Sequence, residues 1–262
     1  LCRYMRSLID PNTAPLRADY REPRDLMICA NNGWVVALDN VSHIPAWLSD
    51  CFCRLATGGG FSTRTLYEND EETIFAAKRP LILNCIDEVV TRSDLLDRSL
   101  LLNLPRIEQE NRVGEKYLDA QFAEALPRIL GGLLSAVSCA LRNEKTVTLP
   151  KLPRMADFAV WATAAEPAIG LQRGEFMDAY TSNREAGNEN AIEASPVGKA
   201  IVDFIGEIGE WSGTSTDLLG ELERISDEKT KRLKSWPSTA RAMGAAVKRL
   251  APNFRADHFF TL

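Results

Sequence analysis

Histidine is scarce in this sequence and its cysteines are scattered, and both features argue against a protein-bound metal centre. The 262 residues include two histidines, His43 and His258, too few for a histidine-based metal site or catalytic triad. Six cysteines are present, but no two form a CxxC pair, so zinc binding is not expected. We interpret the cysteines as buried thiols of a protein that works in a reducing compartment.

Two nucleotide-binding signatures and any membrane signal are also missing. There is no G-x-x-x-x-G-K-[ST] phosphate loop and no dinucleotide-binding glycine fingerprint. The Gly198-Lys199 pair lacks the upstream glycine that such a loop needs. No run approaches the roughly 18 apolar residues of a membrane span, and no signal peptide is visible. We therefore expect a cytoplasmic protein with no membrane contact.

The composition is that of a globular protein with a sizeable core: 45% of the residues are hydrophobic and 26% are charged. The formal net charge is -5, so the molecule as a whole does not attract nucleic acid. Any contact with DNA must use a local basic patch.

Polar side chains follow two apolar runs that read as buried strands. Residues 34–38 form an apolar run that ends at Asp39, and residues 80–83 form another that ends at Asn84. Arg98 precedes a third apolar run, residues 99–104. A carboxylate for Mg²⁺, an amide that orients water and an arginine near phosphate are typical of nucleotide hydrolysis. The alternatives are a helix-capping Asp39 and an Arg98 paired at the surface with Asp94 or Asp97.

The element pattern predicts three regions. Apolar runs separated by short helical segments predict an α/β core over residues 1–112. Helical periodicity predicts an α-helical subdomain over residues 113–190. In residues 196–262, three predicted helices and a terminal strand at 257–262 are the pattern of a winged helix.

Basic residues mark two candidate DNA contacts. Residues 61–67 and 73–77 are predicted to form a β-hairpin whose acidic tip would repel phosphate, leaving Arg64, Lys78 and Arg79 at its base. The C-terminal region offers a second group of cations, represented by Lys234, Arg241, Lys248 and Arg249. The alternative in both places is an ordinary solvated surface.

Several segments carry a family resemblance. Residues 44–48 (IPAWL), 55–67 (LATGGGFSTRTLY) and 80–84 (PLILN), with Phe75, resemble the superfamily 3 helicase domain of phage and poxvirus-type primase-helicases. The similarity covers about residues 1–105, and Gly60 stands where the family pattern has an acidic residue. Residues 152–158 (LPRMADF) and the C-terminal region resemble ATP-binding proteins of bacterial mobile elements.

The resemblance implies an incomplete AAA+ type P-loop ATPase core that uses ATP and Mg²⁺. It implies that Asp39 ends the metal-holding strand, that Asn84 is the sensor asparagine and that Arg98 is an arginine finger. Arg154 would be a second sensor arginine that contacts nucleotide; its alternative is a solvent-facing arginine at a helix start. It also implies DNA as a partner, a homo-oligomer such as a hexamer, and a primase or other replication protein nearby.

Two departures from the family pattern leave the function open. The phosphate loop is missing, so we expect that the chain begins inside a domain and binds ATP poorly as it stands. Asn40 stands where many ATPases place glutamate, and an amide cannot accept a proton from water; Asp87 or Glu88 could replace it. The sequence therefore predicts part of an ATP-dependent DNA helicase of mobile-element or phage replication, or alternatively a non-catalytic module that binds DNA or a replication protein.

Overall fold

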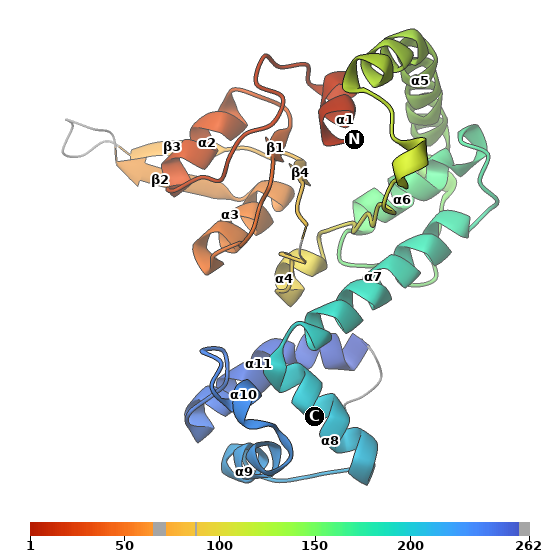
Figure 1. Ribbon diagram of the computed structural model, residues 1–262. Helices are drawn as coiled ribbons and strands as arrows, with labels where there is room; N and C mark the ends of the chain where they lie inside the picture. Colours follow the sequence, from red (N-terminus) through yellow and green to blue (C-terminus); the bar gives the residue numbers. More distant parts are fainter. Residues whose placement is uncertain (65–71, 87, 257–262) are drawn as a thin grey trace. The chain divides into compact units, whose positions relative to one another are not determined.

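The computed structural model describes residues 1–64, 72–86 and 88–256, with the side chains of 61–64, 72–76 and 256 outside that description (Figure 1). The chain divides into two compact units. The first consists of residues 1–89 and 100–181, and the second of residues 90–99 and 182–262.

Three helices and a buried strand form the first part of unit one: α1 (Cys2–Ile9), α2 (Pro23–Asn31), β1 (Val36–Leu38) and α3 (Ala46–Thr57). Pro23 is the first residue of α2, where its missing N–H costs no hydrogen bond, and Gly58 ends α3 with a left-handed φ of 82°. All of β1 is buried, as are Leu26 of α2 and Phe52 of α3. These elements match the short helices and the first strand that the sequence predicts.

Two separate strand pairs are present in the described residues (Figure 1). β1 lies parallel to β4 (Leu81–Leu83), with Val36 opposite Leu81 and Leu38 opposite Leu83. Arg17 forms a parallel bridge to Leu38 on the other side of β1. β2 (Gly60–Arg64) and β3 (Glu72–Ala76) form the predicted antiparallel hairpin, whose tip includes residues outside the description.

The predicted α/β fold of the AAA+ P-loop type is wrong. Helices make up most of the described residues, and parallel pairing within them is limited to two strands of three residues each and the single bridge of Arg17 to Leu38. The third predicted strand, residues 99–104, is not a strand, and Leu100, Leu102 and Leu104 are exposed. An apolar run becomes a strand only where it joins a ladder of backbone hydrogen bonds with a neighbouring strand, and residues 99–104 belong to neither strand pair.

The rest of unit one is helical. It contains η1 (Gln109–Asn111), α5 (Glu115–Asn143), η2 (Glu144–Thr146), α6 (Ala156–Ala165), η3 (Glu166–Ala168) and the start of α7 (Glu175–Glu193). The sequence predicts two helices, at residues 115–126 and 127–142, but α5 is one helix that contains Pro127. α6 packs on α5 around Ala140 and Ala164. α1 also packs on α5, where the rings of Tyr4 and Phe122 stack with 4.3 Å between their centroids.

α5 exposes much of its apolar surface. With η2 it is long and apolar enough to cross a membrane by length and composition, a test that core helices of other proteins also pass. Its exposed apolar side chains concentrate in the C-terminal half, at Ile129, Leu130, Leu133, Leu134, Val137 and Leu141.

Unit two contains the end of α7 together with α4 (Ser93–Leu96), α8 (Pro196–Ile208), α9 (Ser215–Ile225), α10 (Glu228–Lys231) and α11 (Ala240–Ala256). Its core is built from Phe204, Leu222, Trp236, Met243 and Phe254 with their neighbours. Ser195 caps α8 and Thr214 caps α9 through a capping box with Asp217. The three helices predicted for the winged helix are present; its predicted strand at 257–262 lies outside the described residues, so the winged helix stays a prediction.

Candidate functional site

Asp39 and Asn84 meet at the carboxyl edge of the parallel strand pair. Each residue directly follows its strand, and the register of β1 with β4 brings the two strand ends level. The side-chain amide of Asn84 donates a hydrogen bond to Asp39, with 2.6 Å between Nδ2 and Oδ1. The carboxyl edge of parallel strands is where open α/β sheets bind ligands.

Backbone hydrogen bonds hold this pair from both sides. The Asn84 N–H donates to the Leu38 carbonyl at 3.0 Å, and the Val41 N–H returns to the Asn84 carbonyl at 2.9 Å. Asp39 and Asn40 lie between these two hydrogen bonds, and Asn40 has a left-handed φ of 53°. Asparagine tolerates this conformation better than most residues. On the other flank, the Asp39 N–H donates to the Arg17 carbonyl at 2.9 Å.

The pair is open to solvent, since both Asp39 and Asn84 are exposed. Among the residues that the structure describes, no three histidine, cysteine or acidic side chains gather as a metal cage. One carboxylate beside an amide supplies too few ligands to hold Mg²⁺ alone. Such a pair fits Mg²⁺ when substrate phosphates and water provide most of the ligands. Asn40 is exposed beside the pair, and Glu88 is also exposed, while Asp87 lies outside the described residues.

Arg98 belongs to unit two, whereas Asp39 and Asn84 belong to unit one. Its Nη1 donates to the Asp94 carbonyl at 2.5 Å, and its buried Nε has no hydrogen-bond partner. The alternative surface pairing with Asp94 or Asp97 is absent from the described residues. Asp94 instead pairs with Arg92 and Asp97 pairs with Arg184. Partial burial raises the pKa of the Asp94 carboxyl, but the hydrogen bonds and charge of Arg92 together with backbone hydrogen bonds outweigh burial, so the pKa is lowered.

Arg154 lies exposed in the turn before α6. At the hairpin base, Lys78 is exposed, and the guanidinium of Arg79 lies over the ring of Trp34 at 4.7 Å. The side chain of Arg64 lies outside the description.

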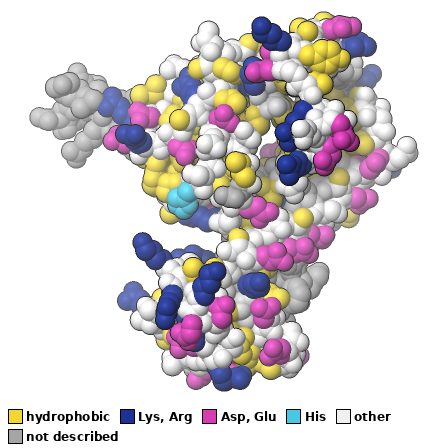
Figure 2. Space-filling view, in the orientation of Figure 1, with side chains coloured by type: hydrophobic (Ala, Val, Ile, Leu, Met, Phe, Trp, Pro, Cys, Tyr) yellow, Lys and Arg dark blue, Asp and Glu magenta, His cyan; other side chains and the backbone are white. Residues whose placement is uncertain are grey.

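The C-terminal cations are exposed. Lys234, Arg241, Lys248 and Arg249 reach solvent and form no ion pair within the ranges that the structure covers. Lys231, by contrast, pairs with Glu228 at 2.5 Å, and Arg224 pairs with Glu221 at 3.0 Å. Figure 2 shows the dark-blue Lys and Arg side chains of unit two interspersed with magenta acidic ones. The basic surface is therefore a set of separate unpaired cations rather than a continuous basic face.

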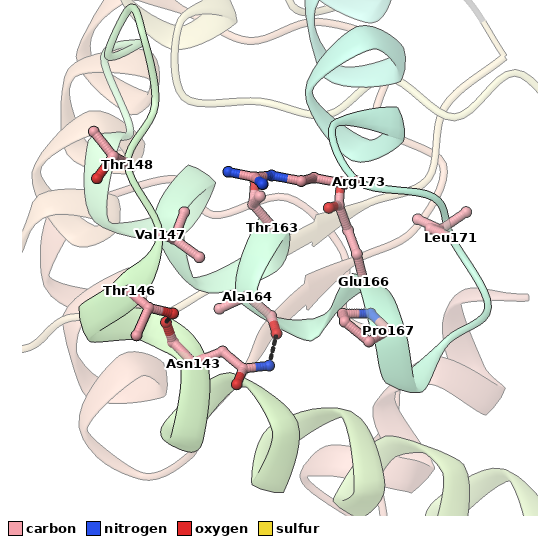
Figure 3. A pocket seen from close by; sticks show the side chains of 10 residues that line it. All are labelled: Asn143, Thr146, Val147, Thr148, Thr163, Ala164, Glu166, Pro167, Leu171 and Arg173. Atoms are coloured by element: carbon pink, nitrogen blue, oxygen red, sulfur yellow. Dashed lines mark hydrogen bonds between the residues drawn. The ribbon is translucent and has the colours of Figure 1, made fainter.

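A hollow of about 300 Å³ lies beside α5 and α6, and none of its lining residues is a site residue that the sequence predicts (Figure 3). Its polar groups serve mainly to hold the fold. Glu166 is buried and accepts hydrogen bonds from the backbone N–H groups of Gly174 and Phe176, and Asn143 donates to the Ala164 carbonyl at 3.3 Å. The lining is completed by Thr146, Val147, Thr148, Thr163, Pro167, Leu171 and Arg173.

Two family models cover most of the chain. One, described as actinomycete integrative conjugative element replication protein, matches residues 2–188. The chain belongs to this family. A second model, described as AICE RepA C-terminal domain, matches residues 197–258. No curated protein and no solved structure matches the chain.

Membership of this family confirms the mobile-element replication part of the sequence interpretation. The finer resemblance to superfamily 3 and poxvirus-type helicases stays a prediction. The roles predicted for Asp39, Asn40, Asn84, Arg98 and Arg154 likewise stay predictions, although the structure brings the first three together.

Sequence reasoning missed the network that supports the start of β1. Arg6 is buried and forms an ion pair with Asp10, with 3.4 Å between Nη2 and Oδ2. The same Asp10 oxygen accepts the backbone N–H groups of Trp34 and Val35 at 3.0 and 3.1 Å. The local signal in the sequence was that Arg6 shares a face of α1 with apolar residues. This spacing does not predict a contact with the start of β1.

Proposed function

We propose that the chain contributes to ATP-dependent DNA unwinding during replication of an actinomycete integrative conjugative element, with Asp39 and Asn84 at its nucleotide site. The supporting observation is the hydrogen bond between these side chains at the carboxyl edge of β1 and β4. Family membership supports the replication context. The proposal concerns this pair of residues and does not require the AAA+ fold.

Each residue has a defined task in this proposal. Asp39 presents a carboxylate oxygen to a phosphate-bound Mg²⁺, which when bound would neutralise charge on the phosphates. Asn84 holds the other oxygen of Asp39, which fixes the direction of the carboxylate, and its amide is placed to orient a water molecule. Asn40 cannot accept a proton from that water, so rate enhancement comes from positioning and electrostatics.

The test is DNA-stimulated ATP turnover by the protein expressed from its full reading frame. Asp39→Ala should lower turnover by at least about a hundredfold, in line with the loss of one electrostatic contributor. Asp19→Ala is the matched control, because Asp19 is an exposed aspartate of the same unit. Equal turnover of the Asp39→Ala variant and the parent would remove the site from the proposal.

A second candidate function is DNA binding without hydrolysis. The observation that favours it is the set of exposed, unpaired cations in unit two, Lys234, Arg241, Lys248 and Arg249. Each phosphate contact releases a counterion, so affinity should fall steeply as salt rises. This function predicts salt-sensitive DNA binding by the whole chain with no turnover, and a Lys248→Ala, Arg249→Ala variant with weaker binding and a shallower salt dependence. The matched control is Lys231→Ala, because Lys231 is already paired with Glu228.

A further inference from the structure

Trp34 is the most exposed of the five tryptophans. Its exposed fraction is 69%, whereas Trp47, Trp161 and Trp211 are partly buried and Trp236 is buried in the core of unit two. Trp34 precedes β1 and Asp39 follows it, so the indole lies at the opposite end of the strand from the Asp39–Asn84 pair. The separation along the strand is about 16 Å.

One face of the indole is occupied by a fixed cation. The Arg79 guanidinium lies over the ring at 4.7 Å from its centroid. Arg79 Nε donates to the carbonyls of Ala30 and Gly33, at 2.9 and 2.7 Å, and Nη1 donates to the Lys78 carbonyl at 3.0 Å. The guanidinium is thus held by three backbone carbonyls and cannot swing away from the ring.

The backbone beneath the indole is fixed as well. The N–H groups of Trp34 and Val35 both donate to Asp10 Oδ2, and that carboxylate is itself paired with the buried Arg6. A fixed backbone and a fixed cation on one face leave the ring with little freedom, while its exposure leaves the other face open to solvent. A rigid aromatic ring loses little conformational entropy when something stacks on it.

We propose that the open face of Trp34 is a stacking platform for a base of single-stranded nucleic acid. An exposed aromatic ring beside fixed cations is the combination used to bind single strands, because bases stack on the ring and cations attract the backbone. Here the cations are Arg79 behind the ring and the adjacent, exposed Lys78. Lysine and arginine next to the ring favour a polyanion over an apolar protein surface.

The inference rests on the DNA-binding role proposed above. It adds that the chain prefers single-stranded to duplex DNA and that Trp34 contacts the bases. The experiment is fluorescence anisotropy of a labelled oligothymidylate, titrated with the whole chain in the absence of ATP. Trp34→Ala should weaken binding roughly ten- to a hundredfold, the loss expected for one stacked base. Trp34→Phe should keep much of the affinity, because a smaller ring still stacks. Ile28→Ala is the matched control: it removes an exposed apolar side chain of the preceding helix, 44% exposed, and should change nothing.

A second measurement covers the case of a poorly folded alanine variant. The oligonucleotide should quench tryptophan fluorescence in the parent, and Trp34→Phe should remove most of that quenching. Unchanged affinity of a folded Trp34→Ala variant would overturn the proposal, and so would an equal loss for duplex DNA, whose bases are already stacked on each other. ATP turnover is read separately, so a chain that binds single strands through Trp34 but hydrolyses nothing would refute only the catalytic proposal.

Discussion

The amide of Asn84 and the carboxylate of Asp39 are hydrogen bonded across two strands while both side chains stay exposed. An exposed hydrogen bond exchanges with water and adds little to the free energy of unfolding. Asn84→Ala should therefore change this free energy by less than about 1 kcal/mol, because the backbone bonds of Asn84 to Leu38 and Val41 are unaffected. Urea unfolding followed by circular dichroism measures the change. A loss of several kcal/mol would mean that the pair serves stability rather than a ligand.

The ion pair between Arg6 and Asp10, unlike the Asp39–Asn84 hydrogen bond, should contribute strongly to the free energy of unfolding. Arg6 is 1% exposed, and Asp10 accepts two backbone N–H groups in addition to the guanidinium. Asp10→Ala leaves the buried Arg6 guanidinium without its counter-charge, with only the backbone carbonyls of Asp10 and Pro15 as acceptors, and it removes the acceptor of two backbone N–H groups. It should therefore lower the free energy of unfolding by about 3 kcal/mol. The same urea experiment measures it. Arg128→Met, a change at an exposed arginine of α5, is the control and should stay within about 0.5 kcal/mol.

Substitutions at Asn40 should show whether stability depends on its left-handed backbone conformation. Its φ of 53° lies in the left-handed region, which glycine adopts freely and β-branched residues adopt poorly. Asn40→Val should cost about 1–2 kcal/mol of stability, whereas Asn40→Gly should be close to neutral. Chemical denaturation of the two variants gives the comparison. If valine and glycine were equally tolerated, the path of the chain between Leu38 and Val41 would not depend on a left-handed conformation at this residue.

The meeting of Asp39 with Asn84 could be predicted from the sequence because it follows from a local pattern. Two apolar runs that end in polar residues place those residues at the same edge once the runs pair in parallel. Most helices were predictable for a similar reason, since apolar spacing and caps such as Thr214 and Asp217 act within a few residues.

What escaped prediction depends on contacts between distant residues. Residues 99–104 have the apolar composition of a strand, but strand formation needs a partner backbone, and composition does not say whether one is present. The bridge of Arg17 to Leu38 and the bonds of Asp10 to Trp34 and Val35 have no local signal either. The error about the fold class has this origin: three strand-like runs predict an α/β core, but two of them form one short parallel pair and the third is not a strand.

The start of α9 should make unit two sensitive to acid. Asp217 accepts hydrogen bonds from the Thr214 hydroxyl at 2.7 Å and from its N–H at 2.9 Å, and these bonds lower the pKa of the Asp217 carboxyl. The pKa of Asp227 at the start of α10 is lowered in the same way by Thr230. A pKa that is lower in the folded than in the unfolded state stabilises the fold above the unfolded value, near pH 4, and this contribution is lost as the pH falls through the folded value.

Urea unfolding of the whole chain, followed by circular dichroism at pH values from 7 down to about 3, measures this loss. The urea concentration at the unfolding midpoint should decrease once the pH is below about 4. Asp217→Asn should flatten part of this fall, because an amide does not titrate. Thr214→Ala should lower stability at neutral pH by about 1 kcal/mol, the usual cost of losing an N-terminal cap. Asp203→Asn, a change at an exposed aspartate of α8, is the matched control and should leave the pH dependence as it is. If Asp217→Asn followed the parent curve at every pH, the capping box would not contribute to acid sensitivity.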